Sequence, residues 1–133
     1  YEAAFTPVQR GLIETVHNEN ADQSITGASG GAPTDDRVFA LSETESVIYL
    51  NTPAARSDIG AAPVTEHAAD GPLSVSEDGT ADWWLRSPGT YGFATQFVDA
   101  SGTPSLSGAN VDLQYGVRPA LWIDVAGTGE GTR

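Results

Sequence analysis

The stretch Trp83-Trp84-Leu85-Arg86-Ser87-Pro88-Gly89 decides the fold class of this chain. Its large apolar side chains are typical of a buried β-strand, and the Pro-Gly pair is a turn signal that ends the strand. Phe93–Val98 predicts a second strand, Asp99–Gly102 a turn, and Thr103–Ser107 a strand that pairs back as a hairpin. The C-terminal half is therefore expected to form an antiparallel run of strands.

One more strand is predicted further along the chain, over Val117–Val125. This stretch is rich in β-forming residues and apolar on both faces, as in a strand that is covered on both sides. Pro119 lies within it, and because a proline cannot donate to a β-ladder, it favours an edge position or a bulge. The tail Ala126–Arg133 is rich in Gly, Thr and Glu, which is typical of a linker.

Two helices are predicted in the N-terminal half, each beginning at a capping box. Thr6-Pro7-Val8-Gln9 combines an N-cap Thr, a Pro at the first helical position and a Gln at the third, and predicts a helix that ends near Val16. Ser42-Glu43-Thr44-Glu45 predicts a second helix to about Leu50. A short buried strand is predicted between them, over Asp36–Leu41.

This order of elements predicts an α+β fold in one domain, Tyr1–Val125, because helices come first and a run of strands follows. We expect two N-terminal helices packed on a twisted antiparallel sheet with long irregular loops. Two segments rich in polar residues, Gly and Pro are predicted as those loops, and long loops often serve in binding. They are Asn18–Thr34 and Asn51–Asp82.

The charge and the composition exclude several kinds of partner and chemistry. The net charge is −12 and all 6 positive residues are arginine, so nucleic acid is not an expected partner. The absence of cysteine removes disulfides, thiolate metal sites and cysteine nucleophiles. No apolar run approaches the roughly 18 residues that a membrane helix needs, so direct membrane insertion is not expected. The chain has no Met, and we expect it to be embedded in a longer polypeptide.

Five residues of the strand motifs are expected to be structural: Trp83, Trp84, Arg86, Arg118 and Trp122. The tryptophans can bury a large apolar area. The two arginines lie in apolar strands, where an unpaired charge is costly, so each needs acidic or carbonyl partners. Three acidic residues are candidate partners, namely Asp35, Asp36 and Asp82. The alternative is that the arginines grip a carboxylate or sulfate of a ligand.

Three motifs together resemble a bacterial domain family of unknown function that occurs in surface and secreted proteins of gut bacteria. They are Asp36–Ser42 (DRVFALS), Trp83–Gly89 (WWLRSPG) and Gly116–Ile123 (GVRPALWI). This family is similar to the C-type-lectin-like fold of formylglycine-generating enzymes and of retroelement-diversified variable proteins. The resemblance implies a lectin-like scaffold that displays variable loops for ligand binding, in an extracellular or cell-surface protein. The enzymatic relatives use cysteines, which this chain lacks, so catalysis is not expected.

Three other patterns contain residue types that occur in catalytic or metal sites, but each has a simpler interpretation. Gly27-Ala28-Ser29-Gly30-Gly31 matches the nucleophile-elbow pattern, but a polar loop precedes it, and Pro33 follows. His17 and His67 lack the spacing of a zinc site, so no metal site is predicted from histidine. Glu77–Asp82 offers carboxylates to a Ca²⁺ ion but does not match the EF-hand spacing, so a solvated acidic turn is the simpler interpretation and no cofactor is predicted.

The candidate contact surface lies between the second and third motifs, where loops join the strands. Six residues are predicted to contact a ligand: Tyr91, Gln96, Asn110, Asp112, Gln114 and Tyr115. Phe93 and Phe97 share one parity in a predicted strand and are expected in the core. We expect a non-catalytic ligand-binding or adhesion module with a protein or glycan as its ligand. The alternatives are a structural spacer without a ligand and a hydrolase.

Overall fold

The fold combines short helices with short antiparallel strands. The computed structural model describes residues 3–50 and 60–126. Its elements in chain order are α1 (Pro7–Leu12), β1 (Val16–Asn18), β2 (Thr34–Asp36), α2 (Glu43–Leu50), β3 (Ala62–Pro63), α4 (Glu66–Ala69), β4 (Thr80–Ala81), β5 (Trp83–Pro88), β6 (Ala94–Val98) and β7 (Pro104–Asn110). Within these residues the strands form antiparallel sheets β1–β2, β3–β4 and β5–β6–β7, which confirms the α+β class.

The β5–β6–β7 sheet grows from the strand Trp83–Pro88. In β5 and β6, Trp83 lies opposite Val98 and Trp84 lies opposite Phe97. The predicted turn between β6 and β7 is confirmed, because the Asp99 N–H donates to the Thr103 carbonyl (2.9 Å) and the Gly102 N–H to the Asp99 carbonyl (2.8 Å). The local signals of the C-terminal half therefore predict this hairpin correctly.

The core lies on the face of β5 and β6 that carries Trp83, Leu85 and Val98, with Leu50 of α2 packed among them. Gln96 is on the same face and is 0% exposed. This reverses the predicted parity of β6, because Phe97 lies on the opposite, half-buried face. Phe93 was expected in the core and is 60% exposed, since β6 begins only at Ala94.

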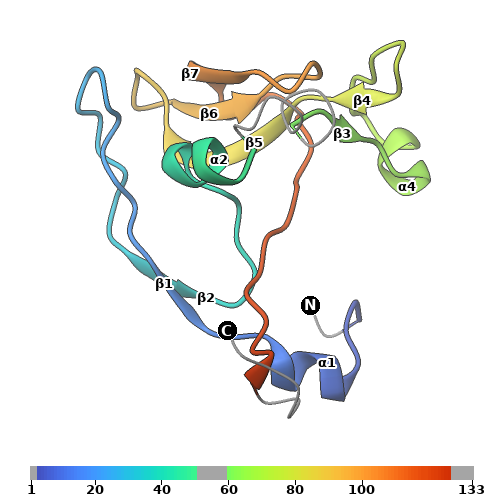
Figure 1. Cartoon of the computed structure of the whole chain (residues 1–133). Helices are drawn as coiled ribbons and strands as arrows, with labels where there is room; N and C mark the ends of the chain where they lie inside the picture. The colour runs from blue at the N-terminus through green and yellow to red at the C-terminus, as the bar shows by residue number, and fades with distance from the viewer. Residues whose placement is uncertain (1–2, 51–59, 127–133) are drawn as a thin grey trace.

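Helix α2 lies against the main sheet and contacts β5 and β7 (Figure 1). Its predicted capping box is confirmed in both directions. The Ser42 N–H donates to a Glu45 carboxylate oxygen (2.9 Å), and the Glu45 N–H donates to the Ser42 hydroxyl (3.2 Å). The capping box fixes the start of the helix, so that Leu50 at its end reaches the core.

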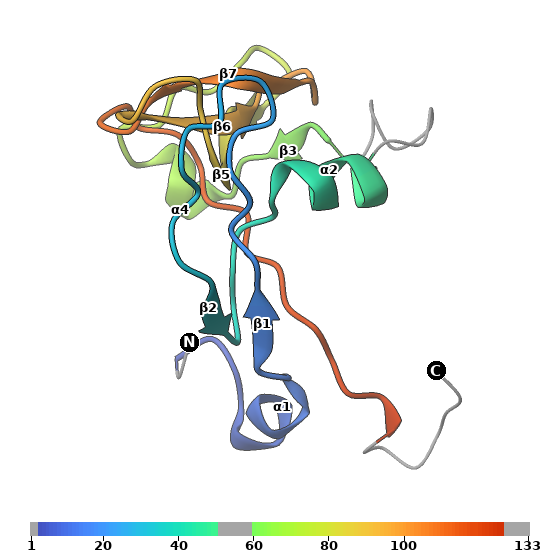
Figure 2. The same cartoon turned by 90° about the vertical axis from the view of Figure 1, so that its left-hand side faces the viewer.

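Helix α1 lies at the opposite end of the molecule from the main sheet, so the expected packing of both helices on one sheet describes α2 only (Figures 1 and 2). The Thr6–Gln9 capping box is confirmed. The helix ends at Leu12 rather than near Val16, because Ile13 is already extended. The backbone of Ile13 instead forms a bridge to Ile123.

The segment predicted as the last strand, Val117–Val125, is extended but does not join the main sheet. It forms isolated bridges, Trp83 to Gly116, Phe39 to Ala120 and Ile13 to Ile123. It therefore runs between the two ends of the molecule, as the orange-red trace in Figure 1 shows. The predicted strand is therefore not formed. The isolated bridges of Ala120, Ile123 and the preceding Gly116 reach three distant parts of the chain.

The predicted strand Asp36–Leu41 and the two predicted loops are corrected in detail. Strand β2 ends at Asp36, and the residues after it are held by the Phe39–Ala120 bridge. The described part of the second loop contains β3, α4 and β4. Residues 51–59 of that loop, and residues 127–133 of the predicted linker, lie outside the described residues.

Candidate functional site

A turn of residues 23–28 is built around the side chain of Gln23. This side chain is buried, and its carbonyl oxygen accepts hydrogen bonds from the N–H groups of Ile25 (2.7 Å) and Thr26 (2.6 Å). Its amide nitrogen donates to the Leu106 carbonyl of β7 (3.3 Å). A turn far away in sequence is thereby fastened to the edge of the main sheet, and Ile25 at its tip is exposed.

The loop between β5 and β6 lies beside this turn. The Thr26 hydroxyl donates to the Thr90 carbonyl (3.4 Å), and the Thr90 N–H donates to the Ser107 carbonyl of β7 (3.0 Å). Two glycines allow the close approach: a Cβ on Gly89 would lie 2.6 Å from the Ser107 carbonyl oxygen, and one on Gly108 would lie 2.5 Å from the Thr95 carbonyl oxygen. The loop is therefore held in place mainly by backbone contacts, with one side-chain bond from the Thr90 hydroxyl to the Ser107 carbonyl (3.3 Å).

Tyr91 and Phe93 project from this loop into solvent, 64% and 60% exposed. Their rings are stacked, with centroids 5.6 Å apart and planes inclined by 6°. The Val111 N–H donates to the Phe93 carbonyl (3.1 Å), which brings the exposed Val111 alongside. We call Ile25, Tyr91, Phe93 and Val111 the loop-end patch. Four large apolar side chains exposed on adjoining loops form a patch of the kind that marks interaction sites.

The structure separates the six predicted contact residues. Tyr91 belongs to the loop-end patch, and Asn110 and Asp112 are exposed on either side of Val111. Gln114 and Tyr115 line a different hollow, next to Ala68 of α4 and the Pro72–Leu73 turn. The five predicted residues that reach the surface therefore lie in two places and do not form one surface.

Gln96 was predicted as a contact residue and is instead buried. Its amide nitrogen donates to a Glu43 carboxylate oxygen (2.8 Å) and to the Pro88 carbonyl (3.1 Å). With no exposed surface it offers nothing to a ligand. The reversed parity of β6 explains the error, because it turns Gln96 toward the core.

Tyr115 is half-buried among aromatic rings on the face of β5 and β6 that is turned away from the core. Its ring centroid lies 4.4 Å from that of Trp84 and 4.8 Å from that of Phe97. Burial, together with the negative charge of Asp82, raises the pKa of the Tyr115 hydroxyl. The residue packs against the sheet, and only part of it reaches the surface.

Three residues of the loop-end patch are not among the predicted contact residues: Ile25, Phe93 and Val111. Phe93 shares its parity with Phe97, and that pattern predicts a core position for both. Ile25 is the single large aliphatic residue in the polar segment 18–34. An isolated large apolar residue in such a loop is a signal that could have indicated a contact position.

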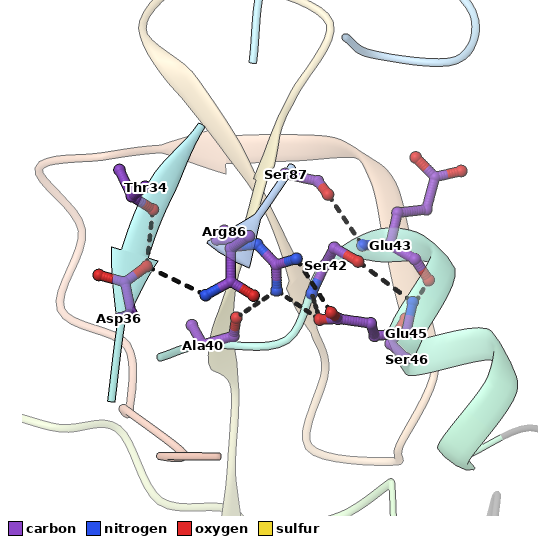
Figure 3. Close-up of polar contacts among 10 residues, drawn as sticks. Thr34, Asp36, Ala40, Ser42, Glu43, Glu45, Ser46, Arg86 and Ser87 are labelled. Carbon is purple, nitrogen blue, oxygen red and sulfur yellow. Dashed lines mark hydrogen bonds and ion pairs between the residues drawn. The ribbon is translucent and has the colours of Figure 1, made fainter. Parts of the chain in front are cut away.

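The motif arginine Arg86 lies in a buried junction with α2 (Figure 3). Its guanidinium group forms two hydrogen bonds with the Glu45 carboxylate, one of them 3.0 Å long, and a third to the Ala40 carbonyl (2.9 Å). The Arg86 side chain is only 16% exposed. Burial acts to raise the pKa of Glu45, but the bonds from Arg86 and Ser42 outweigh it and hold this pKa below its usual value.

The expected partner of Arg86 is thus corrected: Arg86 pairs with Glu45, since the capping box places that carboxylate beside it. Asp36 accepts from the Thr34 hydroxyl (2.6 Å) and Asn18 (3.0 Å), and these bonds lower its pKa. Asp35 contacts His17 (2.8 Å) and raises the pKa of that histidine. Asp82 accepts from the N–H of Ala100 (2.8 Å).

The remaining structural residues take different positions. The guanidinium carbon of Arg118 lies 5.1 Å from the centroid of the buried Trp83 ring, as in a cation–π contact. Burial lowers the pKa of Arg118. Trp122 is largely exposed and contacts Tyr49 edge-on, with ring centroids 6.1 Å apart. Trp83 and Trp84 therefore serve the scaffold, whereas Trp122 contributes mostly to the surface.

The chemical alternatives have the following basis in the structure. Ser29 lies in an exposed loop, where its hydroxyl accepts from the Gly31 N–H (3.2 Å), and no helix follows it. Among the described residues, no group of three or more His, Asp or Glu side chains is arranged to hold a metal ion. No helix in residues 3–50 or 60–126 is long and apolar enough to span a bilayer.

The chain matches the family described as Domain of unknown function (DUF6273) over residues 1–125. It therefore belongs to this family, and the match covers all three motifs and the loop-end patch. Neither the curated proteins nor the solved structures include a match to it.

Proposed function

We propose that this domain is a non-catalytic ligand-binding module of a larger bacterial surface or secreted protein, and that the loop-end patch is its contact surface. The observation that carries the proposal is the exposed, stacked pair Tyr91 and Phe93 on a loop that backbone contacts hold in place. Preorganised aromatic residues give a large contact area at a small cost in entropy.

The sequence resemblance supports the same proposal. A C-type-lectin-like scaffold displays its loops for binding. In this chain the motif residue Trp83 is buried and Arg86 is mostly buried, while Tyr91 and Phe93 on the loop that follows them are exposed. The polar neighbours Asn110 and Asp112 offer hydrogen bonds at the rim of the patch. The net charge of −12 favours neutral or basic ligands over acidic ones.

The test is binding of the whole chain to glycan and protein arrays, followed by the variants Tyr91→Ala and Phe93→Ala. We expect each variant to lower the affinity for any ligand found by at least tenfold, as the loss of a central aromatic contact does. The matched control is Tyr49→Ala, which removes an exposed aromatic ring on α2 that is not part of the loop-end patch. A ligand that both patch variants bind as well as the original chain would place the contact surface elsewhere.

The same experiment addresses the structural alternative. A spacer or assembly domain has no ligand of its own, so it would bind to nothing on either array. Alanine variants of a spacer would then differ from the original chain only in stability. Binding that depends on Tyr91 and Phe93 is expected only if the domain is a ligand-binding module.

A further inference from the structure

Residues 116–125 form a segment, which we call the seam, that joins the two ends of the molecule, and the chain bends at Val125. Its hydrogen bonds use alternate residues. Ala120 exchanges bonds with Phe39 (2.7 and 3.0 Å), the Trp122 carbonyl accepts from Glu14 (3.0 Å), and the Asp124 N–H donates to Leu12 (2.8 Å). In Figure 2 helix α1 and the chain between β2 and α2, which carry these partners, lie to one side of the orange-red trace. The seam is thus paired along one edge.

Among the residues that the structure describes, the other edge of the seam is open. In an extended chain, successive residues direct their backbone polar groups to opposite sides. The N–H groups of Leu121 and Ile123 therefore point away from the paired edge, and within residues 3–50 and 60–126 neither has a hydrogen-bond partner. A row of unpaired backbone groups of this kind is a template for another strand.

The side chains along the seam are apolar and accessible. Val117 is 75% exposed, and Trp122, Ile123 and Val125 are also exposed. Leu121 lies between two apolar hollows, one lined by Phe39, Leu41 and Tyr49, and the other by Phe5, Leu12 and Ile13. An open edge combined with exposed apolar side chains indicates a site for strand addition.

The seam is complementary to itself in antiparallel register. If two copies meet with Leu121 opposite Leu121, then Val117 faces Val125 and Arg118 faces Asp124, in both halves of the pair. Opposite charges in facing positions stabilise a strand pair. Pro119 falls opposite Ile123, where its carbonyl accepts the Ile123 N–H of the second copy.

We propose that a second copy of this chain pairs along the open edge of the seam, in a two-fold antiparallel arrangement centred on Leu121. The self-complementary order of Val117, Arg118, Asp124 and Val125 supports this occupant, since a strand of unrelated sequence would not require that symmetry. A two-fold dimer uses the same patch on both copies and closes without leaving a further edge. This surface is separate from the loop-end patch, so the two proposals stand or fall independently.

The register is tested with single introduced cysteines. Because the chain has no cysteine of its own, any disulfide must form between the introduced residues. A hydrogen-bonded pair of facing residues has Cα atoms about 5.5 Å apart, within reach of a disulfide. Leu121→Cys should therefore give a covalent dimer under mild oxidation. The matched control is Val117→Cys on the same edge. In the proposed register the two Val117 positions lie 8 residues apart along the strand pair, roughly 26 Å, so this variant should not cross-link. The double variant Val117→Cys/Val125→Cys should cross-link again, because these two positions face each other.

A charge exchange gives a second and independent test by sedimentation equilibrium. Arg118→Asp should weaken dimerisation about tenfold, because both facing pairs become repulsive. The double variant Arg118→Asp/Asp124→Arg should restore it, whereas a purely structural role of Arg118 against Trp83 would not be restored.

Three results would overturn the proposal. One is a chain that stays monomeric at concentrations of about 0.5 mM, well above the range in which weak specific interfaces form. Another is cross-linking of Val117→Cys as efficient as that of Leu121→Cys. The third is slow hydrogen exchange of the Leu121 and Ile123 amides in a monomer, which would show that something other than a second copy covers the edge.

Discussion

Arg86 and Tyr91 lie five residues apart in the chain and occupy opposite environments. The charged arginine is inside, 16% exposed, and the aromatic tyrosine is outside, 64% exposed. Proteins usually distribute these residue types the other way. Arg86 can be buried because Glu45 and the Ala40 carbonyl meet its guanidinium group. Tyr91 is exposed because glycines and backbone hydrogen bonds hold its loop, so that its ring has no packing role there.

The comparison indicates a division of labour between the junction and the loop-end patch. The junction, Arg86 with Glu45, joins β5 to α2 through a mostly buried ion pair, and we expect it to stabilise the fold. The patch lies on the loop that leaves the same strand, and it carries the proposed binding. If this division is correct, substitutions in the two regions should have opposite profiles: large effects on unfolding in the junction, and large effects on binding in the patch.

The largest effect is expected from Arg86→Ala. Removing one partner of a mostly buried ion pair leaves the Glu45 carboxylate without compensation, and the free energy of unfolding should fall by about 3 kcal/mol or more. Urea denaturation followed by tryptophan fluorescence measures this. Arg86→Lys keeps the charge without the two-pronged geometry and should lose less. A variant with alanine here that unfolds within about 1 kcal/mol of the original chain would contradict the stability role of the junction.

A somewhat smaller effect is expected from Gly108→Ala, at the place where β7 touches the β5–β6 loop. Gly108 has a φ of 76°, and a Cβ there would lie 2.5 Å from the Thr95 carbonyl oxygen. The strain should cost about 1–3 kcal/mol. The variant should also weaken ligand binding, because the patch is carried on this contact. Gly11→Ala, where a Cβ meets nothing within 4 Å, is the matched control. Equal stability of both variants would show that the close approach is unimportant.

The pH dependence of stability tests the ion pair of the junction without removing Arg86. The pKa of Glu45 is lowered in the folded chain, so its carboxylate contributes stability above its unfolded pKa, about 4.3, and loses it as the pH falls through the lower folded value. The stability advantage of the original chain over Glu45→Gln should therefore be full at pH 7 and shrink below about pH 4.3. An advantage that stays constant down to pH 2.5 would mean that the ion pair does not govern this part of the titration.

The smallest effect on stability is expected in the loop-end patch. Tyr91→Ala and Phe93→Ala should each change the free energy of unfolding by no more than about 0.5 kcal/mol, because the two side chains are exposed and contact mainly each other. The same urea titrations compare them directly with Arg86→Ala. A loss of 2 kcal/mol, roughly that of a buried aromatic contact, would give the pair a structural role and weaken the proposed division.

The outcome for individual residues shows how far local signals reach. The capping boxes at Thr6 and Ser42 and the turn Asp99–Gly102 were predicted correctly, because each depends on residues within four positions of one another. The exposure of Phe93 and the burial of Gln96 were not, since parity alone does not say which face of β6 receives the core. The partner of Arg86 was missed for a similar reason: Glu45 lies 41 residues away and was interpreted only as a helix cap.

The sequence by itself determined the α+β class, the starts of α1 and α2, the β6–β7 hairpin and the strand character of Trp83–Ser87. These follow from backbone propensities and short-range hydrogen bonds, which neighbouring residues control. Only the tertiary structure decided which face of the sheet is buried, which carboxylate meets Arg86, and that Ile25 joins Tyr91 and Phe93 in one patch. Those contacts join segments tens of residues apart, and their geometry depends on how all the elements pack together.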